Sequence, residues 1–515
     1  MKKIVTFLSV LFALNSNSQI FHKKYAYSNH IMNGSTSCVN NNRIYTASSD
    51  IMANTSFDIQ KTDLNGNLVD AQQISWSSSG PTYTVRKMIT SGDKLYIVGA
   101  VNTGTQAEAL LVVLDTNLTS VVFSKTYGTL TNGEEFYDVI KTSSTDLVMV
   151  GHMTVPTATA SVFRNIPYVV RASILNGNPV YQKSYDDGYH KFCYSVLEDP
   201  SNTAIYISGQ MPSNAGSHIF KITDDNLGNV MVTKSLFFSA GQSMQCKKMQ
   251  IQGSKLFMVG GDFNNMLITM QTDLNLNTFQ MPKYYTNFKY YDHTNVLGSN
   301  YIAGIYTPTS STNYLGALKM DSLFTPQINM TYSLVNLPLG NWNGINVVNK
   351  NATMYWIAHE AWTAPMPYTN RYIVASDMLL NAICNTSITL TTANLIQTPT
   401  SITFTVPAAS YTVISSAATA SVITPTITTL CSATGIENVN ENFEKFVIKN
   451  GTDKVTIESP YSEFSVNVFD MSGKLITTVN SNAEVTEINT ADLANGIYII
   501  QLKAKGYEQR QKIIH

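Results

Sequence analysis

The chain has 515 residues, of which 44% are hydrophobic and 13% charged, and its formal net charge is −1. This length allows two or three domains, the hydrophobic content excludes wholesale disorder, and the lack of a basic surplus argues against nucleic acid as a partner. The chain is rich in Tyr (28) and Phe (21). Together with many Thr, Ser and Asn residues, these favour an all-β fold whose strands are joined by polar turns.

Residues 1–18 have the pattern of a signal peptide. Lys2 and Lys3 precede a short apolar run (residues 4–14), and Ser16 and Ser18 are the small residues expected before a cut. The run is too short to cross a bilayer, and no later stretch reaches the roughly 18 apolar residues that a membrane helix requires. We therefore expect export of a mature chain that has no transmembrane segment.

An apolar phrase that ends in a small residue recurs along the chain. Its seven copies end at Ser48, Gly99, Gly151, Gly209, Gly260, Gly304 and Ala358. The copies follow one another at a nearly regular spacing, with a period of roughly 52 residues. A period of this length is typical of folds built from one repeated supersecondary unit.

Each copy has the same order of short strands and turns. A strand and a polar turn precede the phrase, and a third strand, a tight turn and a fourth strand follow it, as in residues 110–115 and 181–185. Seven such units predict a seven-bladed β-propeller over residues 19–385, because radial packing of the sheets buries both faces of each. A parallel β-helix is disfavoured, since its repeats are shorter and lack tight hairpins.

The N-terminal residues indicate how the ring closes. Residues 21–25 (FHKKY) match the fourth-strand phrase of later units, such as residues 123–127 (FSKTY). This fourth strand comes before any complete unit. We therefore expect it to complete the seventh blade, whose own fourth strand is hard to recognise, and so to cover an exposed sheet edge.

Residues 386–435 are dominated by Thr, Ser, Ala, Ile and Pro. This composition fits either an extended linker or an edge strand against the propeller. Cys384 and Cys431 bracket most of the segment, and export would permit a disulfide between them. The chain has five Cys at wide spacings, which indicates neither a disulfide scaffold nor a zinc site.

Residues 436–515 have a separate pattern of short alternating segments, which predicts a small immunoglobulin-like β-sandwich. Three phrases follow in order: VNVFDMSGK (466–474), INTADLANGIY (488–498) and the terminal KIIH (512–515). They resemble the type A sorting domain of the type IX secretion (Por) system of Bacteroidota, although the Pro-Asn-Pro phrase that usually opens this family is missing. The residues that carry the resemblance are Asp470, Gly473, Lys474, Leu493, Gly496, Tyr498 and Lys512.

This resemblance implies a route and a set of partners. A general secretory pathway would bring the chain to the periplasm, and the type IX secretion translocon would then recognise the folded sandwich. The C-terminal signal peptidase of that system would remove the sorting domain. The remaining protein would be secreted or attached to the outer-membrane surface.

We find no catalytic, metal or cofactor motif in the sequence, and we expect no cofactor and no metal. His359 and Glu360 begin like a zinc-protease motif, but the second His of that motif is missing. The Asp-containing turns supply no obvious set of six oxygen ligands, so we interpret them as hairpin turns rather than calcium loops.

The longer and more variable loops are expected on one face of the ring, because the loops after the second and fourth strands of an antiparallel blade emerge together. Binding residues usually lie on such loops. The loop of the seventh unit combines aromatic and polar groups that suit a sugar or a peptide, and aromatic packing under the loop is the alternative explanation. The candidate ligand-binding residues are His359, Glu360, Trp362, Tyr368 and Arg371.

Two functions are open at this point. The propeller is either a non-catalytic binding or adhesion module for an extracellular carbohydrate or protein ligand, or a secreted hydrolase that acts on polysaccharide. Hydrolysis would need carboxylates that converge near the ring axis, for which the sequence offers Asp50, Asp262 and Glu360. These residues belong to units that are not all neighbours, and charge is scarce, so we favour binding.

Overall fold

The computed structural model of this chain contains strands and turns and, among the residues it describes, no helix. The chain forms two compact units, Met1–Ser432 and Ala433–His515. The described residues are 22–514 except for 29–31, 51–55, 77–81, 103, 105, 130–131, 158–161, 202, 212–215, 239–243, 263, 281, 310–311, 333–341, 351, 361–367, 382–384, 388–390, 395–396, 402–411, 416–417, 423–425, 432–446, 451–453, 460–462, 471–473, 484, 492, 495 and 505–506.

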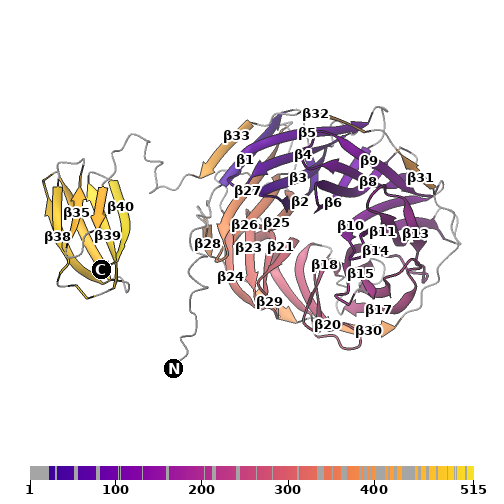
Figure 1. Ribbon diagram of the computed structural model, residues 1–515. Helices are drawn as coiled ribbons and strands as arrows, with labels where there is room; N and C mark the ends of the chain where they lie inside the picture. Colours follow the sequence, from indigo (N-terminus) through magenta and orange to yellow (C-terminus); the bar gives the residue numbers. More distant parts are fainter. Residues whose placement is uncertain are drawn as a thin grey trace, which may run out of the picture. The chain divides into compact units, whose positions relative to one another are not determined.

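The first unit is a ring of antiparallel sheets, or blades, in each of which four strands follow one another from the ring axis outward (Figure 1). The described residues form seven blades, which confirms the predicted seven-bladed β-propeller. Blade 1 consists of β2 (Met32–Asn40), β3 (Arg43–Asp50), β4 (Ser56–Asp63) and β5 (Leu68–Trp76); blade 2 of β6 (Thr82–Ser91), β7 (Lys94–Asn102), β8 (Ala107–Asp115) and β9 (Val121–Gly128); blade 3 of β10 (Gly133–Lys141), β11 (Asp146–Pro156), β12 (Phe163–Ser173) and β13 (Pro179–Ser184). Blade 4 consists of β14 (Phe192–Glu198), β15 (Ala204–Met211), β16 (Gly216–Thr223) and β17 (Val230–Phe238); blade 5 of β18 (Gln245–Gln252), β19 (Lys255–Gly261), β20 (Met266–Asp273) and the start of β21 (Lys283–Val296); blade 6 of the rest of β21, β22 (Ser299–Thr309), β23 (Thr312–Met320) and β24 (Pro326–Tyr332); blade 7 of β25 (Trp342–Lys350), β26 (Thr353–Glu360), β27 (Tyr368–Asp377) and β1 (His22–Ser28).

Blades 5 and 6 share the long strand β21. Its residues 283–286 lie at the outer edge of blade 5, and its residues 288–296 form the innermost strand of blade 6 against β22. Asn287 stands between the two parts with a φ of 63°. Asn adopts this left-handed conformation more readily than most residues, so it suits the point where the chain changes blade.

Blade 7 takes its fourth strand from the other end of the chain. Strand β1 runs antiparallel to β27, with His22 opposite Val374 and Ser28 opposite Tyr368. The N-terminal strand therefore completes the last repeat and joins the two ends of the ring. This pairing covers the outer edge of β27, which would otherwise present unpaired backbone groups.

The segment after blade 7 runs back around the outside of the ring and forms what we call the outer belt (residues 385–431; Figure 1). Its described residues add a fifth strand to blades 6, 5, 4, 2, 1 and 7, in that order. Residues 402–411 lie outside the described residues. The belt strands are β28 (Asn385–Ser387) on β24, β29 (Thr391–Asn394) on β21, β30 (Gln397–Ser401) on β17, β31 (Thr412–Ser415) on β9, β32 (Ala418–Val422) on β5 and β33 (Thr426–Cys431) on β1. Cys384 lies outside the described residues, so the disulfide with Cys431 that export would permit is not tested by the structure.

The hydrophobic core of the propeller lies between neighbouring blades. The second strand of a blade is buried on both faces, as in β7, where residues 95–101 are all buried. This double burial explains why the repeated phrase is a continuous apolar run instead of an alternating one. Each interface between blades holds an apolar cluster; at the first, Phe57 and Ile74 of blade 1 pack with Ile97 and Val112 of blade 2.

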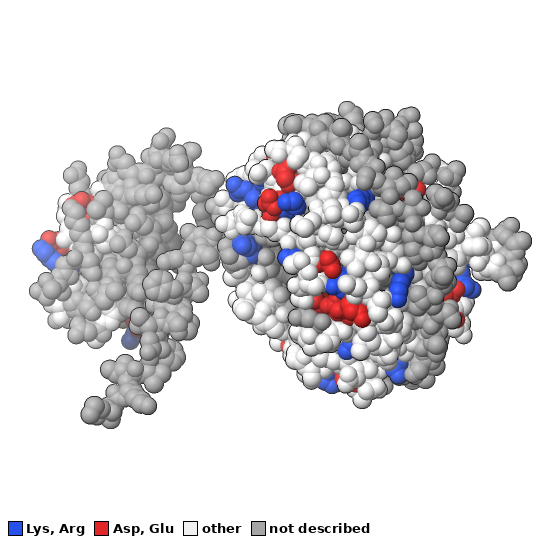
Figure 2. Space-filling view, turned by 45° about the vertical axis from the view of Figure 1, so that its right-hand side comes forward, with Lys and Arg blue, Asp and Glu red and all other residues white. Residues whose placement is uncertain are grey.

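The outer surface carries few charges, in line with the low charged content of the chain. Figure 2 shows Lys and Arg atoms interspersed with Asp and Glu atoms over a mostly uncharged face. The described part of this face therefore lacks a large area of one sign that would steer a charged macromolecule.

The second unit contains two antiparallel sheets. One consists of β34 (Val447–Asn450), β35 (Lys454–Glu458) and β38 (Val485–Asn489), and the other of β37 (Leu475–Ser481), β36 (Phe464–Asp470), β39 (Ile497–Ala504) and β40 (Tyr507–Ile514). Val455 and Ile457 of the first sheet pack against Val466, Val468 and Ile500 of the second. The unit is thus a small β-sandwich with its own core, as predicted.

Candidate functional site: an axial pocket

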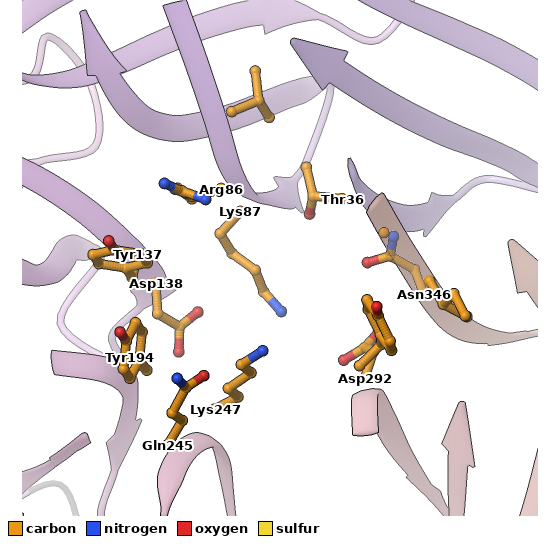
Figure 3. Close-up of a pocket in the computed structure, with 14 residues that line it drawn as sticks. Thr36, Arg86, Lys87, Tyr137, Asp138, Tyr194, Gln245, Lys247, Asp292 and Asn346 are labelled. Carbon is orange, nitrogen blue, oxygen red and sulfur yellow. The ribbon is translucent and has the colours of Figure 1, made fainter. Parts of the chain in front are cut away.

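A pocket of about 370 Å³ lies on the propeller axis (Figure 3). Every blade contributes to its wall, because the lining residues all come from the innermost strands. They are Thr36 of β2, Val85, Arg86 and Lys87 of β6, Tyr137 and Asp138 of β10, Tyr194 of β14, Gln245 and Lys247 of β18, Tyr291 and Asp292 of β21, and Gly344, Ile345 and Asn346 of β25. A volume of this size is within the range of small-molecule binding pockets.

The repeated glycine explains how these residues reach the axis. In blade 2, a Cβ atom at Gly99 would lie 1.7 Å from the carbonyl oxygen of Thr84. The innermost strand approaches so closely because its pairing shifts by one residue between Val85 and Lys87, as in a β-bulge, and leaves Arg86 unpaired. Glycine is therefore required on the second strand, and the unpaired residue is presented to the axis.

The same device operates in the five blades whose phrase ends in glycine. A Cβ atom at any of these glycines would lie 1.7–2.1 Å from a carbonyl oxygen of the neighbouring strand. Each innermost strand shifts its register at the matching point. The unpaired residues, which we call the bulge residues, are Arg86, Tyr137, Tyr194, Lys247 and Tyr291, and all five line the pocket.

The bulge residues of blades 2 to 4 contact one another. The Arg86 guanidinium forms an ion pair of 2.6 Å with Glu135 and lies 4.9 Å from the centre of the Tyr137 ring. Tyr137 in turn meets the Tyr194 ring edge-on, with ring centres 4.7 Å apart. Cation–π and edge-to-face contacts of this kind hold the rings in fixed orientations around the pocket.

Lys247 has polar and aromatic neighbours but no carboxylate among the described residues. Its Nζ lies 3.3 Å from Oδ1 of Asn265 and 6.0 Å from the centre of the Tyr291 ring. Burial and the positive charge of Arg86 lower the pKa of Lys247 to about 8. Lys247 is therefore a cation that is poorly compensated by the protein around it.

The two carboxylates of the pocket wall hold neighbouring blades together. Asp138 of blade 3 accepts a hydrogen bond of 2.9 Å from the backbone N–H of Val196 in blade 4, and Asp292 of blade 6 accepts one of 3.1 Å from Val347 in blade 7. Blades 1 and 4 have hydroxyl side chains at the same position. Thr36 Oγ1 accepts a hydrogen bond of 2.8 Å from the backbone N–H of Met88 in blade 2, and Ser195 Oγ accepts one of 3.1 Å from that of Met249 in blade 5. These side chains satisfy buried backbone donors, which is a structural task.

Blades 2 and 5 have lysines at this position. Lys248 forms an ion pair of 3.3 Å with Asp292 and donates a hydrogen bond to the backbone carbonyl of His293. Lys87 projects into the pocket (Figure 3), and its Nζ makes no hydrogen bond or ion pair with any described residue. Burial opposes its charge, but the nearby carboxylates Asp138 and Asp292 outweigh burial and raise the pKa of Lys87. The ammonium group is thus held charged and faces open space.

Two residues of the predicted seventh-unit site lie inside the protein. His359 and Arg371 stand opposite each other on β26 and β27, and both are completely buried between blades 7 and 1. His359 Nδ1 lies 3.1 Å from Ser48 Oγ, and Arg371 donates hydrogen bonds of 2.9 Å to that oxygen and 2.7 Å to Gln60 Oε1. Burial, with Arg371 close by, lowers the pKa of His359 well below its ordinary value. These contacts bind one blade to the next.

The other predicted residues of this loop are described less fully. Glu360 ends β26 and Tyr368 begins β27, and only their backbones are described; Trp362 lies outside the described residues. Of the carboxylates considered for hydrolysis, Asp262 is buried and accepts hydrogen bonds from its own turn and from Tyr284. The side chain of Asp50 is not among those described.

Sequence reasoning missed the axial residues, although the sequence contains a signal for them. A cation or a tyrosine stands at a nearly constant spacing before each phrase-final glycine, as with Arg86 before Gly99 and Tyr194 before Gly209. The glycine marks where the neighbouring strand bulges, and the bulge determines which residue faces the axis.

The C-terminal residues that carried the family resemblance form turns and core of the sandwich. Asp470 and Lys474 close the turn between β36 and β37 through two hydrogen bonds of 3.0 Å, one from each backbone N–H. Tyr498 is buried and donates a hydrogen bond of 2.8 Å to the carbonyl of Ala494, while Leu493 packs against the core. Gly473 lies outside the described residues, and Lys512 pairs with Ile499 through the backbone.

Residues 451–515 match the family described as the secretion system C-terminal sorting domain. The sandwich is a type IX sorting domain. Its presence marks the protein for secretion or attachment to the cell surface and implies interaction with the secretion system. Among the residues that the structure describes, we find no helix long and apolar enough to span a membrane.

Comparison with solved structures finds similar strand arrangements in several proteins. The polysaccharide lyase Uly1 is 9% identical over 69% of this chain and 99% of its own, with a TM-score of 0.41. The phage phi92 endosialidase is 9% identical over 69% of each chain (TM-score 0.37), and the NanB sialidase of Streptococcus pneumoniae is 9% identical over 72% of this chain and 70% of its own (TM-score 0.38). A search of curated proteins found no match.

Proposed function

We propose that this protein is an exported, non-catalytic binding module whose ligand enters the axial pocket of the propeller. In this proposal, residues 1–18 are a signal peptide, residues 19–385 with the outer belt form the binding unit, and residues 436–515 are the sorting domain. The observation that carries it is the pocket itself, which is lined from every blade and whose carboxylates are engaged in bonding neighbouring blades.

The hydrogen bonds that these carboxylates already accept within the protein favour a binding role over hydrolysis. A typical glycosidase uses one carboxyl group as an acid and a second as a base or nucleophile, and both must be able to reach the substrate. Asp138 accepts backbone hydrogen bonds from Val139 and Val196, and Asp292 accepts one from Val347 as well as pairing with Lys248. Each of these four carboxylate oxygens therefore already has a partner within the protein, which favours a structural role for both side chains.

The position of the pocket also supports a binding role. Each bulge pairs with the middle or the C-terminal half of the second strand, toward the end from which the chain continues to the third strand. The bulge residues therefore lie toward the ring face on which the longer loops are expected. The connection from β11 to β12 starts after Pro156 and that from β26 to β27 starts after Glu360. Residues 158–161 and 361–367 within them lie outside the described residues. A rigid pocket beneath variable loops is the usual arrangement in proteins that bind ligands on a scaffold.

Binding and hydrolysis can be separated in one set of experiments. The mature chain is incubated with a panel of surface polysaccharides and peptides, and bound ligand and released reducing ends are both measured. We expect saturable binding without release of reducing ends, and loss of binding in the pocket variants Tyr194→Ala and Tyr291→Ala. Tyr189→Ala is the matched control, because Tyr189 is 47% exposed and does not line the pocket.

The proposal fails if the protein releases reducing ends from a polysaccharide and Asp138→Asn or Asp292→Asn abolishes that release while the variants stay folded. It also fails if ligands bind equally well to the wild type and to both pocket variants, because the site would then lie elsewhere.

A further inference from the structure

We propose that the axial pocket binds the carboxylate of an acidic sugar, held between the ammonium groups of Lys87 and Lys247. This inference rests on the proposed function, since it assigns a ligand class to the same pocket. It adds a charge requirement and names the two side chains that impose it.

The charged side chains in and around the pocket leave a surplus of one positive charge. Four cations and three carboxylates either line the pocket or form an ion pair with a residue that lines it. The cations are Arg86, Lys87, Lys247 and Lys248, and the carboxylates are Glu135, Asp138 and Asp292. The pocket is therefore matched to a ligand that carries a single negative charge.

The partners of each cation show which side chain carries the surplus positive charge. Arg86 is paired with Glu135 at 2.6 Å, and Lys248 is paired with Asp292 at 3.3 Å. Lys87 is stabilised at longer range by Asp138 and Asp292. Lys247 has an amide oxygen and an aromatic ring as its neighbours, and neither carries a full negative charge.

A ligand carboxylate between Lys87 and Lys247 would complete this arrangement. In Figure 3 both ammonium groups point into the pocket from opposite sides, Lys87 from β6 and Lys247 from β18. A partly buried cation without a counter-ion is unfavourable, and a charge-assisted hydrogen bond is about twice as strong as a neutral one. The free Nζ of Lys87 and the weakly compensated Nζ of Lys247 would each donate to one carboxylate oxygen.

The rest of the pocket favours a sugar as the carrier of that carboxylate. The volume of about 370 Å³ is much larger than a carboxylate group alone, so most of the ligand must be something else. Tyr137, Tyr194 and Tyr291 offer aromatic surface, and Gln245 and Asn346 offer amide groups that both donate and accept hydrogen bonds. A sugar ring presents apolar C–H faces and hydroxyl groups to such a wall, whereas a phosphate dianion would exceed the single surplus charge.

The test is titration calorimetry of the mature chain with matched pairs of oligosaccharides. Each pair differs only in the terminal sugar, which is glucuronic acid or glucose, or galacturonic acid or galactose. An acidic peptide and inorganic phosphate are titrated alongside. We expect the acidic sugar to bind at least tenfold more tightly than its neutral partner, which corresponds to about 1.4 kcal/mol.

Charge variants test the two lysines. Lys247→Gln and Lys87→Gln should each reduce affinity for the acidic sugar about tenfold and leave affinity for the neutral sugar unchanged, while Lys247→Arg should retain most of the preference. Lys94→Gln is the control, because Lys94 lies at the start of β7 and does not line the pocket. Thermal melts of all variants establish that the propeller is intact.

The outcomes distinguish this inference from the proposed function. Equal binding of acidic and neutral sugars, both lost in Tyr194→Ala, would leave the binding function standing and overturn the charge requirement. Tighter binding of the acidic peptide or of phosphate than of any acidic sugar would overturn the sugar assignment. Failure of every ligand to bind would count against both proposals.

Discussion

The hydroxyl of Tyr25 donates a hydrogen bond to the backbone carbonyl of Gly66. Tyr25 lies in β1, which completes blade 7, and Gly66 lies in the turn between the third and fourth strands of blade 1. The same hydrogen bond recurs around the ring. The hydroxyl of Tyr127 lies 2.7 Å from the carbonyl oxygen of Gly177, and that of Tyr185 lies 2.9 Å from the carbonyl oxygen of Gly228. A tyrosine in the fourth strand, or directly after it in blade 3, thus bonds each of these blades to the next, and Tyr25 does so where the two ends of the ring meet.

Removal of this hydroxyl should weaken ring closure. Tyr25 is fully buried, so Tyr25→Phe keeps the packing of the ring and leaves the Gly66 carbonyl without its donor. Loss of one such hydrogen bond costs about 1 kcal/mol. We expect a lower melting temperature in differential scanning calorimetry, and no change for Tyr189→Phe, whose ring is 47% exposed. A melting temperature equal to the wild type would mean that the bond contributes nothing to closure.

Deletion of residues 19–27 should have a larger effect than the point substitution. It removes most of β1, which pairs with β27 on one side and with β33 of the outer belt on the other. Both neighbours would then expose unpaired backbone groups, and the apolar contacts of Tyr25 with Ile44 and Ile373 would be lost. We expect a clear fall in melting temperature and more aggregation by light scattering. Unchanged stability would show that the ring closes without β1.

Stability should also depend on pH through Glu134. Burial raises the pKa of this carboxyl to about 8, against the opposing effect of two hydrogen bonds from Thr129. A carboxyl whose pKa is higher in the folded state stabilises the fold most below its unfolded pKa of about 4.3, and this contribution is lost as the pH rises toward 8. We therefore expect Glu134→Gln to gain melting temperature relative to the wild type between pH 5 and pH 9. A difference in melting temperature between Glu134→Gln and the wild type that stays constant from pH 5 to pH 9 would contradict this prediction.

Binding of an acidic sugar should weaken as the pH rises through the pKa of Lys247, which is about 8. The ammonium form attracts the carboxylate, and the neutral amine does not. Arg86, Lys87 and Lys248 are the other cations near it, and Glu135, Asp138 and Asp292 are the carboxylates. Calorimetry at pH 7 and pH 9 should show a lower affinity at pH 9, and Lys247→Arg should remove this difference. A pH-independent affinity in the wild type would exclude Lys247 from the binding step.

The ring could be predicted from the sequence because each blade repeats the same local pattern of strands and turns. Buried second strands read as apolar runs, and tight turns follow the third strands, so seven copies could be recognised without knowledge of their contacts. The outer belt could only be stated as a linker or an edge strand. Its residues join the blades through backbone pairing, as Thr428 does opposite Lys24, and backbone pairing leaves little trace in a Thr-rich sequence.

The candidate site could be predicted less well, because its geometry depends on contacts between strands. Gly99 and Gly151 were recognised as repeat positions, but their role is to admit the carbonyl oxygens of Thr84 and Glu135. That close approach is what brings Arg86 and Tyr137 to the axis. His359 was a candidate binding residue because it is polar and lies beside a variable loop. In the structure, the packing of blade 7 against blade 1 buries it beside Ser48.

The sorting domain should act as an address that the propeller does not need in order to fold. Its core is self-contained, since Val455 and Ile457 pack against Val466 and Val468 within residues 433–515. Truncation after residue 435 keeps the outer belt and should give a folded propeller that accumulates in the periplasm, as measured by cell fractionation and thermal melting.

Fusion of residues 436–515 to an unrelated reporter with a signal peptide should send the reporter to the surface or the medium of a host that has the type IX translocon, and the reporter should stay inside a host that lacks it. If the truncated protein still reaches the medium, residues 436–515 are not required for export. If the fused reporter stays in the periplasm of the competent host, they are not sufficient for export. When the longer fusion is exported, a shorter fusion of residues 451–515 tests whether the matched family region alone carries the signal.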